Sequence, residues 1–381
     1  MVKMKRSLIE LVRRDLGSKV VLLSGPRQVG KTTLAKTLFE RFDYFNHDLA
    51  EHRLAIRERS WDRGVDLVVL DELHKMRGWK AWLKGVYDVE GVRPRLLVTG
   101  SARLDVARRV GDSLAGRFFQ HRLHPFDLKE LAGQIPAEEA FETLMRVGGF
   151  PEPFLAGTDR FYRRWRRSHI DVILRQDLID LEAVRDVPAM ETLVELLRRR
   201  VGSPVSMSGL ARDLERDSKT IKRWLSLLEN FCVVFRVTPY HRNVARSLLK
   251  EPKIYFYDNG LVDGDAGVRL ENLVACALHK EIHRIEDAEG LRARLHYLRT
   301  KDKREIDFAV SVGDRVAAMI EVKTADDRPG RAFEHFARFL PGARRVQLVA
   351  RLDREKTYPD GTEVREVIPW LTGLDLLPKE Q

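Results

Sequence analysis

The chain has 381 residues, which is enough for two or three domains at roughly 100–200 residues each. Hydrophobic residues make up 44% of it, enough for packed cores, and its formal net charge at pH 7 is +11. No apolar run approaches the roughly 20 residues that a membrane-spanning helix needs, and the charged N-terminus lacks the uncharged core of a signal peptide. The cysteines Cys232 and Cys276 lie in apolar stretches. We therefore expect a cytoplasmic protein with no membrane partner and no disulfide framework.

The first stretch, to about residue 135, alternates short apolar runs with helical patterns. Runs at 19–24, 43–46, 66–70 and 95–99 predict strands. Apolar strands separated by amphipathic helices are typical of a parallel sheet covered on both faces. We expect residues 1–135 to form an α/β domain and residues 136–190, where the pattern turns helical, to form a lid or linker.

A phosphate-binding motif follows the first predicted strand. The pattern G-x-x-x-x-G-K-[ST] is matched in full, between a buried strand and a helix expected at 33–42. Its glycines let backbone N–H groups wrap the phosphates of a nucleotide, its lysine contacts the β and γ phosphates, and its threonine hydroxyl binds Mg²⁺. The residues expected to bind the nucleotide are Gly25, Pro26, Arg27, Gln28, Val29, Gly30, Lys31, Thr32 and Thr33.

Acidic and hydroxyl side chains follow the next buried strands. Asp71 and Glu72 end an apolar run, where two carboxylates are costly unless a cation or a substrate uses them. We expect Asp71 to hold the Mg²⁺ and Glu72 to polarise the attacking water, while a helix cap formed by either residue is the alternative. Ser101 follows the strand at 95–99 and is expected to help orient that water.

Further segments carry a family resemblance. With the phosphate loop, they are LDELHK at 70–75, TGSA at 99–102, LAGR at 114–117 and GGFPE at 148–152. Over nearly the whole chain they resemble a prokaryotic family of AAA+-type ATPases whose C-terminal half is a domain of unknown function. The resemblance implies an AAA+ fold, ATP with Mg²⁺, and ring-like homo-oligomers in which a neighbour's arginine completes the ATP site. Arg117 matches that arginine best, and the alternatives are Arg103, Arg108, Arg109 or a plain surface role.

Residues 191–262 have the spacing of a winged helix-turn-helix. Ser208 is expected to cap a short helix at 209–215, and a longer helix begins at Lys219 with apolar residues at i, i+3, i+4 and i+7 facing the core. Strands at 233–238 and 253–257 would flank a basic wing. Residues 160–255 contain 20 basic and 12 acidic residues, a surplus that attracts polyanions. We expect DNA contacts through Lys219, Lys222, Arg223, Arg242 and Arg246, and a helical packing module with a solvated charged face is the alternative.

The segment RRWRR at 163–167 allows two interpretations. Its arginines could clamp phosphates while Trp165 stacks on a base. Alternatively, Trp165 belongs to the core and the arginines flank it, which is the commoner arrangement.

Residues 263–381 predict an α+β domain with a candidate second metal site. We expect a helix starting near Glu271, strands at 294–299, 305–312 and 316–323, a helix at 333–340 and a strand at 345–350. A helix glutamate, the strand residue Asp307, and Glu321 and Lys323 on one face of the next strand resemble the PD-(D/E)xK nuclease superfamily, whose fold is restriction-endonuclease-like. The resemblance implies Mg²⁺ held by Glu271, Asp307 and Glu321, with Lys323 at the hydrolytic water. The alternative is a retained fold in which Glu321 and Lys323 form a salt bridge.

Together these features predict an AAA+ ATPase that binds DNA, including branched recombination or repair intermediates, and couples ATP hydrolysis to remodelling or translocation. One alternative is an ATP-dependent, Mg²⁺-requiring nuclease. Another is a signalling or protein-remodelling ATPase that uses the winged helix to dock proteins.

Overall fold

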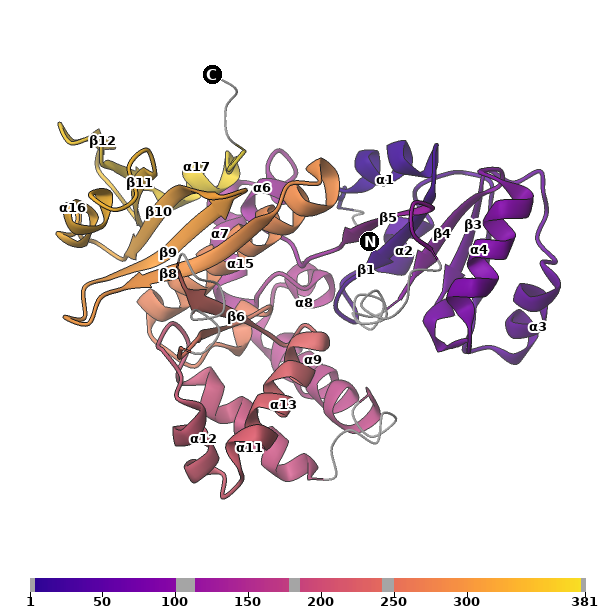
Figure 1. Ribbon diagram of the computed structural model, residues 1–381, viewed down its shortest axis with the longest axis horizontal. Coiled ribbons are helices and arrows are strands. Elements are labelled where there is room, and N and C mark those ends of the chain that lie inside the picture. The colour runs from indigo at the N-terminus through magenta and orange to yellow at the C-terminus, as the bar shows by residue number, and fades with distance from the viewer. Residues whose placement is uncertain (1–3, 101–113, 178–185, 242–249, 378–381) are drawn as a thin grey trace. The chain divides into compact units, whose positions relative to one another are not determined.

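The computed structural model describes residues 4–100, 114–177, 186–241 and 250–377 (Figure 1). They fall into two compact units: Met1–His124 with Asn230–Cys232, and Pro125–Glu229 with Val233–Gln381. The division between these two units lies at residue 124, and the domain boundary at 135 stays a prediction. Several predicted residues lie outside the described ranges: Ser101, Arg103, Arg108, Arg109, Arg242 and Arg246.

The first unit contains the predicted parallel sheet. Its strands are β1 (Val20–Ser24), β2 (Phe42–Asn46), β3 (Leu67–Asp71), β4 (Arg95–Thr99) and β5 (Phe118–Arg122), in the order β2-β3-β4-β1-β5. All four strand pairs are parallel. Every residue of β1 and β3 is buried, which confirms the buried parallel strands predicted from their apolar runs. Strand β5 was not predicted from the sequence.

Short helices accompany this sheet. They are α1 (Ile9–Leu16), α2 (Lys31–Ala35), α3 (Ala50–Glu58), α4 (Trp79–Glu90) and the 3₁₀ turn η1 (Leu73–Lys75). The helix expected at 33–42 is wrong in its extent, because α2 ends at Ala35. Both the hydroxyl and the N–H of Thr37 donate to the carbonyl of Leu34, at 2.8 and 2.9 Å, which turns the chain away from the helix.

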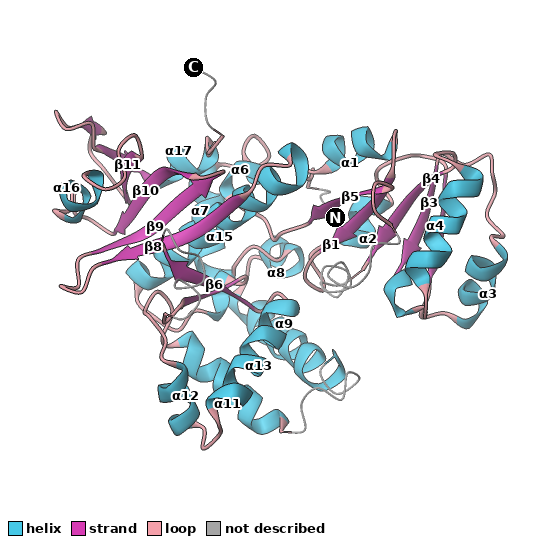
Figure 2. Ribbon diagram, viewed as in Figure 1, coloured by secondary structure: helices cyan, strands magenta, loops and turns pink. Residues whose placement is uncertain are grey.

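The second unit begins with a helical part (Figure 2). Its helices are α6 (Leu128–Leu131), α7 (Ala137–Val147), α8 (Pro151–Ala156), α9 (Asp159–Asp171), the π turn η2 (Val172–Asp177), α11 (Val187–Arg198), α12 (Met207–Asp213) and α13 (Ser218–Asn230). The cap predicted at Ser208 is wrong: the Ser206 hydroxyl accepts from the N–H of Gly209, so α12 starts two residues earlier.

An eight-stranded sheet completes the second unit. Its strands are β6 (Val234–Pro239), β7 (Lys253–Phe256), β8 (Ala293–Arg299), β9 (Glu305–Val312), β10 (Arg315–Lys323), β11 (Arg344–Val349), β12 (Lys356–Thr357) and β13 (Glu363–Glu366), in the order β12-β13-β11-β10-β9-β8-β6-β7. Around them lie the 3₁₀ turn η3 (Asn259–Leu261), α15 (Ala266–Glu289), α16 (Ala332–Ala337) and α17 (Val367–Thr372). Because β6 pairs with β8, the strands expected in a separate wing continue the C-terminal sheet across the boundary expected at 262.

Among the described residues, no helix combines the length and the apolarity that crossing a bilayer requires.

Candidate nucleotide-binding site

The loop between β1 and α2 depends on its two motif glycines. Gly25 and Gly30 have φ values of 149° and 97°, which side chains other than glycine rarely adopt. A Cβ atom at Gly25 would lie 2.3 Å from the carbonyl oxygen of Leu123, just beyond β5. The loop can therefore pass this close to the neighbouring backbone only with glycine.

Lys31 is buried inside this loop. Its side-chain Nζ donates to the carbonyl oxygens of Gly25 and Pro26, at 3.0 and 2.6 Å. Burial lowers the pKa of Lys31 to about 8, against the attraction of the Glu72 and Asp71 carboxylates, which raises it. The loop thus surrounds the poorly hydrated ammonium group of Lys31. Phosphate oxygens could replace the carbonyl oxygens of Gly25 and Pro26 as its hydrogen-bond acceptors.

Asp71 ends β3 and is contacted by three hydroxyl groups. Its Oδ2 accepts from Thr32 Oγ1 at 3.2 Å and from Tyr44 OH at 2.5 Å, and its Oδ1 accepts from Thr99 Oγ1. Burial, and then Asp71 itself, raise the pKa of Tyr44, which keeps its hydroxyl protonated as a donor. The structure therefore brings Thr32 and Asp71 together, as predicted. Tyr44 and Thr99 were missed, although they lie on the strands that flank β3.

Glu72 follows in a left-handed conformation, with φ 56°. Such a conformation is uncommon for a residue other than glycine and clusters at functional sites. Its Oε2 lies 3.3 Å from Lys75 Nζ and 3.7 Å from His74 Nε2. The side chain makes no capping bond to η1, so the helix-cap alternative is wrong for Glu72.

Arg117 lies where the parallel strands start, whereas the phosphate loop lies where they end. Parallel pairing puts Val20 beside Phe118, where β1 and β5 start, whereas the loop follows Ser24, where β1 ends. Its guanidinium Nε donates to Asp88 Oδ1 at 2.6 Å, on α4. Arg117 is therefore not part of its own chain's loop, and both the role in a neighbouring subunit and the plain surface role stay predictions.

Arg6 supports the phosphate loop and was missed in the sequence. It is buried, and its guanidinium donates to the carbonyl oxygens of Val29, at 3.1 Å, and His124. No local motif marks this residue, because its partners lie 23 and 118 positions away.

Helix α13 has the two faces that its pattern predicts. Lys219, Lys222 and Arg223 are exposed, while the predicted core-facing residues are buried: Ile221, Trp224, Leu225 and Leu228. On α9, Trp165 is 6% exposed and its ring stacks on His169 at 4.5 Å. The prediction that Trp165 belongs to the core is confirmed, and the base-stacking alternative is wrong.

Two of the predicted C-terminal carboxylates, together with Glu305, surround a lysine that was not singled out in the sequence. Lys253 is 1% exposed, and its Nζ lies 2.7 Å from Glu305, 3.3 Å from Glu271 and 3.6 Å from Asp307. Burial works against its charge, but the three carboxylates outweigh this effect and raise the pKa of Lys253. Burial also raises the pKa of Glu271 to about 7.

This lysine changes the expectation of a second Mg²⁺ site. Glu321 pairs with Lys323 at 2.8 Å, as the salt-bridge alternative predicts, and Asp307 Oδ2 accepts from the N–H of Val322. Within the described ranges, no group of three or more His, Cys, Asp or Glu residues could hold a metal ion. The site predicted at Glu271, Asp307 and Glu321 is not formed, because Lys253 supplies the positive charge to two of these carboxylates.

Comparisons with known proteins match the chain in three parts. Residues 17–132 match the AAA domain family, residues 138–269 a domain of unknown function (DUF8612), and residues 266–371 another domain of unknown function (DUF4143). An uncharacterized protein of Mycobacterium tuberculosis is 29% identical over 330 residues, which cover 82% of this chain and 72% of the relative. An uncharacterized protein of Haemophilus influenzae is 22% identical and covers 97% of this chain and 98% of the relative.

Solved structures resemble the chain only weakly. The Bacillus subtilis DNA clamp loader delta protein is 12% identical, covers 58% of this chain and 87% of that chain, and has a TM-score of 0.28. This likeness is too weak to bear on fold or function. The sequence match and the parallel sheet together identify residues 17–132 as an AAA domain with a P-loop ATPase fold.

Proposed function

We propose that this chain hydrolyses ATP in the loop between β1 and α2 and couples hydrolysis to remodelling or translocating DNA. The observation that carries the proposal is the 3.2 Å contact between Thr32 and Asp71, beside the buried ammonium group of Lys31. Residues 39 positions apart thus meet at the carboxyl ends of β1 and β3, which flank β4, and α/β sheets bind their ligands at these ends.

The residues present fit ATP with Mg²⁺. The Thr32 hydroxyl and the Asp71 carboxylate are oxygen ligands of the kind that Mg²⁺ prefers, and they already touch. Bound there, Mg²⁺ would neutralise charge on the phosphates. Lys31 would add a second positive charge, and its burial strengthens that charge's electrostatic effect. Glu72 would orient the attacking water and accept its proton, with Lys75 holding the carboxylate in place.

Lys31→Ala tests the central assignment. We expect this variant to lose ATP hydrolysis by at least about 100-fold, the scale seen when a preorganised charge-stabilising group is removed. The measurement is steady-state phosphate release, with circular dichroism to establish folding. Lys301→Ala removes an exposed lysine between β8 and β9 and should retain activity. Unchanged hydrolysis in a folded Lys31→Ala protein would refute the proposal.

Four features support DNA as the partner. The chain carries a net charge of +11, residues 160–255 hold much of the surplus, and α13 exposes three cations above a buried apolar face. Helices α12 and α13, followed by the antiparallel pair β6 and β7, have the order of a winged helix. In such motifs the second helix enters a groove of DNA.

The salt dependence of DNA binding distinguishes this partner from a protein. Each phosphate contact contributes about 0.9 to the slope of log affinity against log salt. Replacing Lys219, Lys222 and Arg223 together by alanine should lower that slope by about 2.7, since phosphate-directed cations act additively. A matched variant replaces the exposed residues Arg338, Arg351 and Arg354 and should leave it unchanged. A flat salt response of the unmodified protein would favour the protein-docking alternative.

The element order of the C-terminal part is that of a restriction-endonuclease-like fold, but the carboxylates that the structure describes there are not arranged to bind Mg²⁺. Its order α15, β8, β9, β10, α16, β11, with β8 to β10 antiparallel and β11 parallel to β10, supports that fold. The ammonium group of Lys253 lies beside Glu271 and Asp307, two of the carboxylates that a nuclease would use for Mg²⁺. We therefore propose a binding role for this part and no cleavage.

A further inference from the structure

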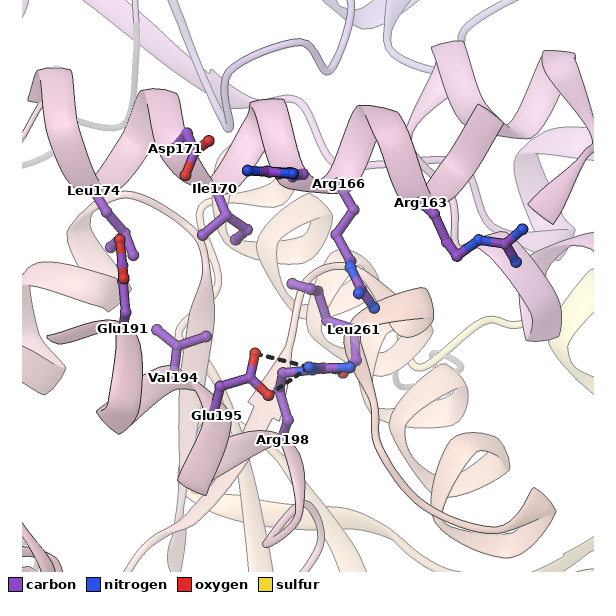
Figure 3. A pocket seen from close by; sticks show the side chains of 11 residues that line it. Arg163, Arg166, Ile170, Asp171, Leu174, Glu191, Val194, Glu195, Arg198 and Leu261 are labelled. Carbon is purple, nitrogen blue, oxygen red and sulfur yellow. Dashed lines mark hydrogen bonds and ion pairs between the residues drawn. The ribbon is translucent and has the colours of Figure 1, made fainter. Parts of the chain in front are cut away.

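A pocket of about 490 Å³ opens between α9 and α11 (Figure 3). Six of its lining residues lie at positions 163, 166, 167, 170, 171 and 174, and four more at 191, 194, 195 and 198. Both sets repeat at three and four residues. The first set occupies one face of α9 and is continued by Leu174 of η2, and the second occupies one face of α11. The volume lies within the range of small-molecule sites.

One end of the pocket is cationic. Arg163, Arg166 and Arg167 lie within about one turn of α9, and none of them forms an ion pair with another residue in the described part of the chain. Arg198, in contrast, is neutralised by Glu195, with 2.6 Å between NH1 and Oε2. The charge of Arg166 also acts on the buried carboxyl group of Asp258, whereas Arg163 and Arg167 form no ion pair in the described residues. An anionic ligand would relieve the repulsion among the three cations.

The middle and the other end of the pocket differ in character. Ile170, Val194 and Leu261 line the middle together with the paired Glu195 and Arg198 (Figure 3). The carboxylates of Asp171 and Glu191 lie beyond them, away from Arg163 (Figure 3). A ligand that fits this pocket has an anionic group for the arginines, a flat apolar body for the middle, and hydrogen-bond donors for the carboxylates. A nucleotide has these three parts: its phosphate, its nucleobase and the amino groups of that base.

We propose that this pocket binds a phosphate together with its nucleobase, either as a free mononucleotide or as a terminal nucleotide of a nucleic-acid strand. Arginine suits the phosphate because its planar guanidinium donates two parallel hydrogen bonds to the oxygens. Trp165 is buried on the other side of α9, so it does not stack on the base. The site is separate from the phosphate loop and does not depend on it.

The test uses the full chain with Lys31→Ala in every protein, so that the phosphate loop contributes little to nucleotide binding. Arg163→Glu with Arg167→Glu reverses two pocket charges. Arg160→Glu with Arg164→Glu makes the same change in net charge on the same helix, at exposed positions that do not line the pocket. The probes are adenosine monophosphate, followed by calorimetry, and a fluorescent single-stranded DNA with a 5′-phosphate, followed by anisotropy.

We expect the pocket variant to bind at least one probe about tenfold or more weakly, while the control variant binds as its Lys31→Ala parent does. Loss for adenosine monophosphate indicates a free nucleotide as the source, and loss for the DNA alone indicates a strand end. Equal losses in both variants, or no binding of either probe, would overturn the proposal. Because Lys31 is already replaced, these outcomes are independent of whether the phosphate loop hydrolyses ATP.

Discussion

At the scale of single residues, Asp258 is a buried carboxyl group with two hydrogen bonds. Its Oδ2 accepts from Tyr162 OH at 2.8 Å and its Oδ1 from the N–H of Gly260 at 3.2 Å. Burial raises its pKa from 3.8 to about 7, although both hydrogen bonds and the charges of Arg166 and Arg198 oppose that rise. The folded state therefore holds a proton that the unfolded chain releases at lower pH.

This difference predicts how stability depends on pH. Between pH 4 and pH 7 the folded state binds more protons than the unfolded state, so Asp258 makes stability fall as pH rises through this window and level off above it. Asp258→Asn should remove up to about 4 kcal/mol of that fall, since each pKa unit corresponds to about 1.4 kcal/mol. An asparagine oxygen can accept from the N–H of Gly260 while its NH₂ group donates to the Tyr162 hydroxyl oxygen, which reverses the direction of that second bond. Urea unfolding of both proteins across this range measures the difference, and parallel pH profiles would contradict the assignment.

At the scale of elements, the turn between α7 and α8 packs directly against the segment before α15. Gly148 has φ 76°, and a Cβ atom there would lie 1.9 Å from Asp258 Oδ1. A Cβ atom at Gly149 would lie 2.3 Å from the carbonyl oxygen of Phe126. The two glycines of the GGFPE segment are thus required by close packing on two different neighbours.

Gly148→Ala should destabilise the protein by about 2–4 kcal/mol, because it adds overpacking to the cost of positive φ. Gly133→Ala is the matched control, since Gly133 has φ 74° and a Cβ atom added there would meet nothing within 4 Å. It should lose only about 1 kcal/mol. Denaturant unfolding compares them, and equal losses would show that packing at Gly148 is not the cause.

At the scale of the whole molecule, the position of Arg117 predicts that hydrolysis depends on assembly. Arg117 lies where the strands start, and Lys31 lies where β1 ends. The two side chains of one chain therefore lie at opposite ends of the sheet and cannot contact the same nucleotide. A ring in which each subunit lends its arginine to the next would join them.

Mixing two inactive variants tests this arrangement. Lys31→Ala and Arg117→Ala should each hydrolyse ATP slowly alone, and a mixture should recover activity, because some interfaces then combine an intact Lys31 with an intact Arg117. Recovery should rise with total protein concentration, as assembly requires. Phosphate release from the mixture, compared with the sum of the separate variants, provides the measurement. Activity that only equals this sum would place Arg117 outside the site.

Local patterns were sufficient for much of the fold and of the nucleotide site. The strands β1, β3 and β4, the glycine loop and the buried face of α13 follow from runs of adjacent residues, because side-chain periodicity and turn conformation act over a few positions. Caps and helix ends were less predictable. The end of α2 depends on Thr37 bonding back to Leu34, and nothing in the apolar pattern marks that contact.

The sequence by itself determined that a glycine loop with Lys31 and Thr32 follows a buried strand, since that chemistry is encoded in eight consecutive residues. Only the tertiary structure decided that Arg6 braces this loop, that Tyr44 binds Asp71 and that Lys253 takes the place expected for a metal ion. The pairing of β6 with β8 also appears only in the folded chain, because their paired residues, such as Thr238 and His296, are far apart in the sequence. The physical reason is the same throughout: these contacts are made between distant segments, and their energies exist only once the chain has folded.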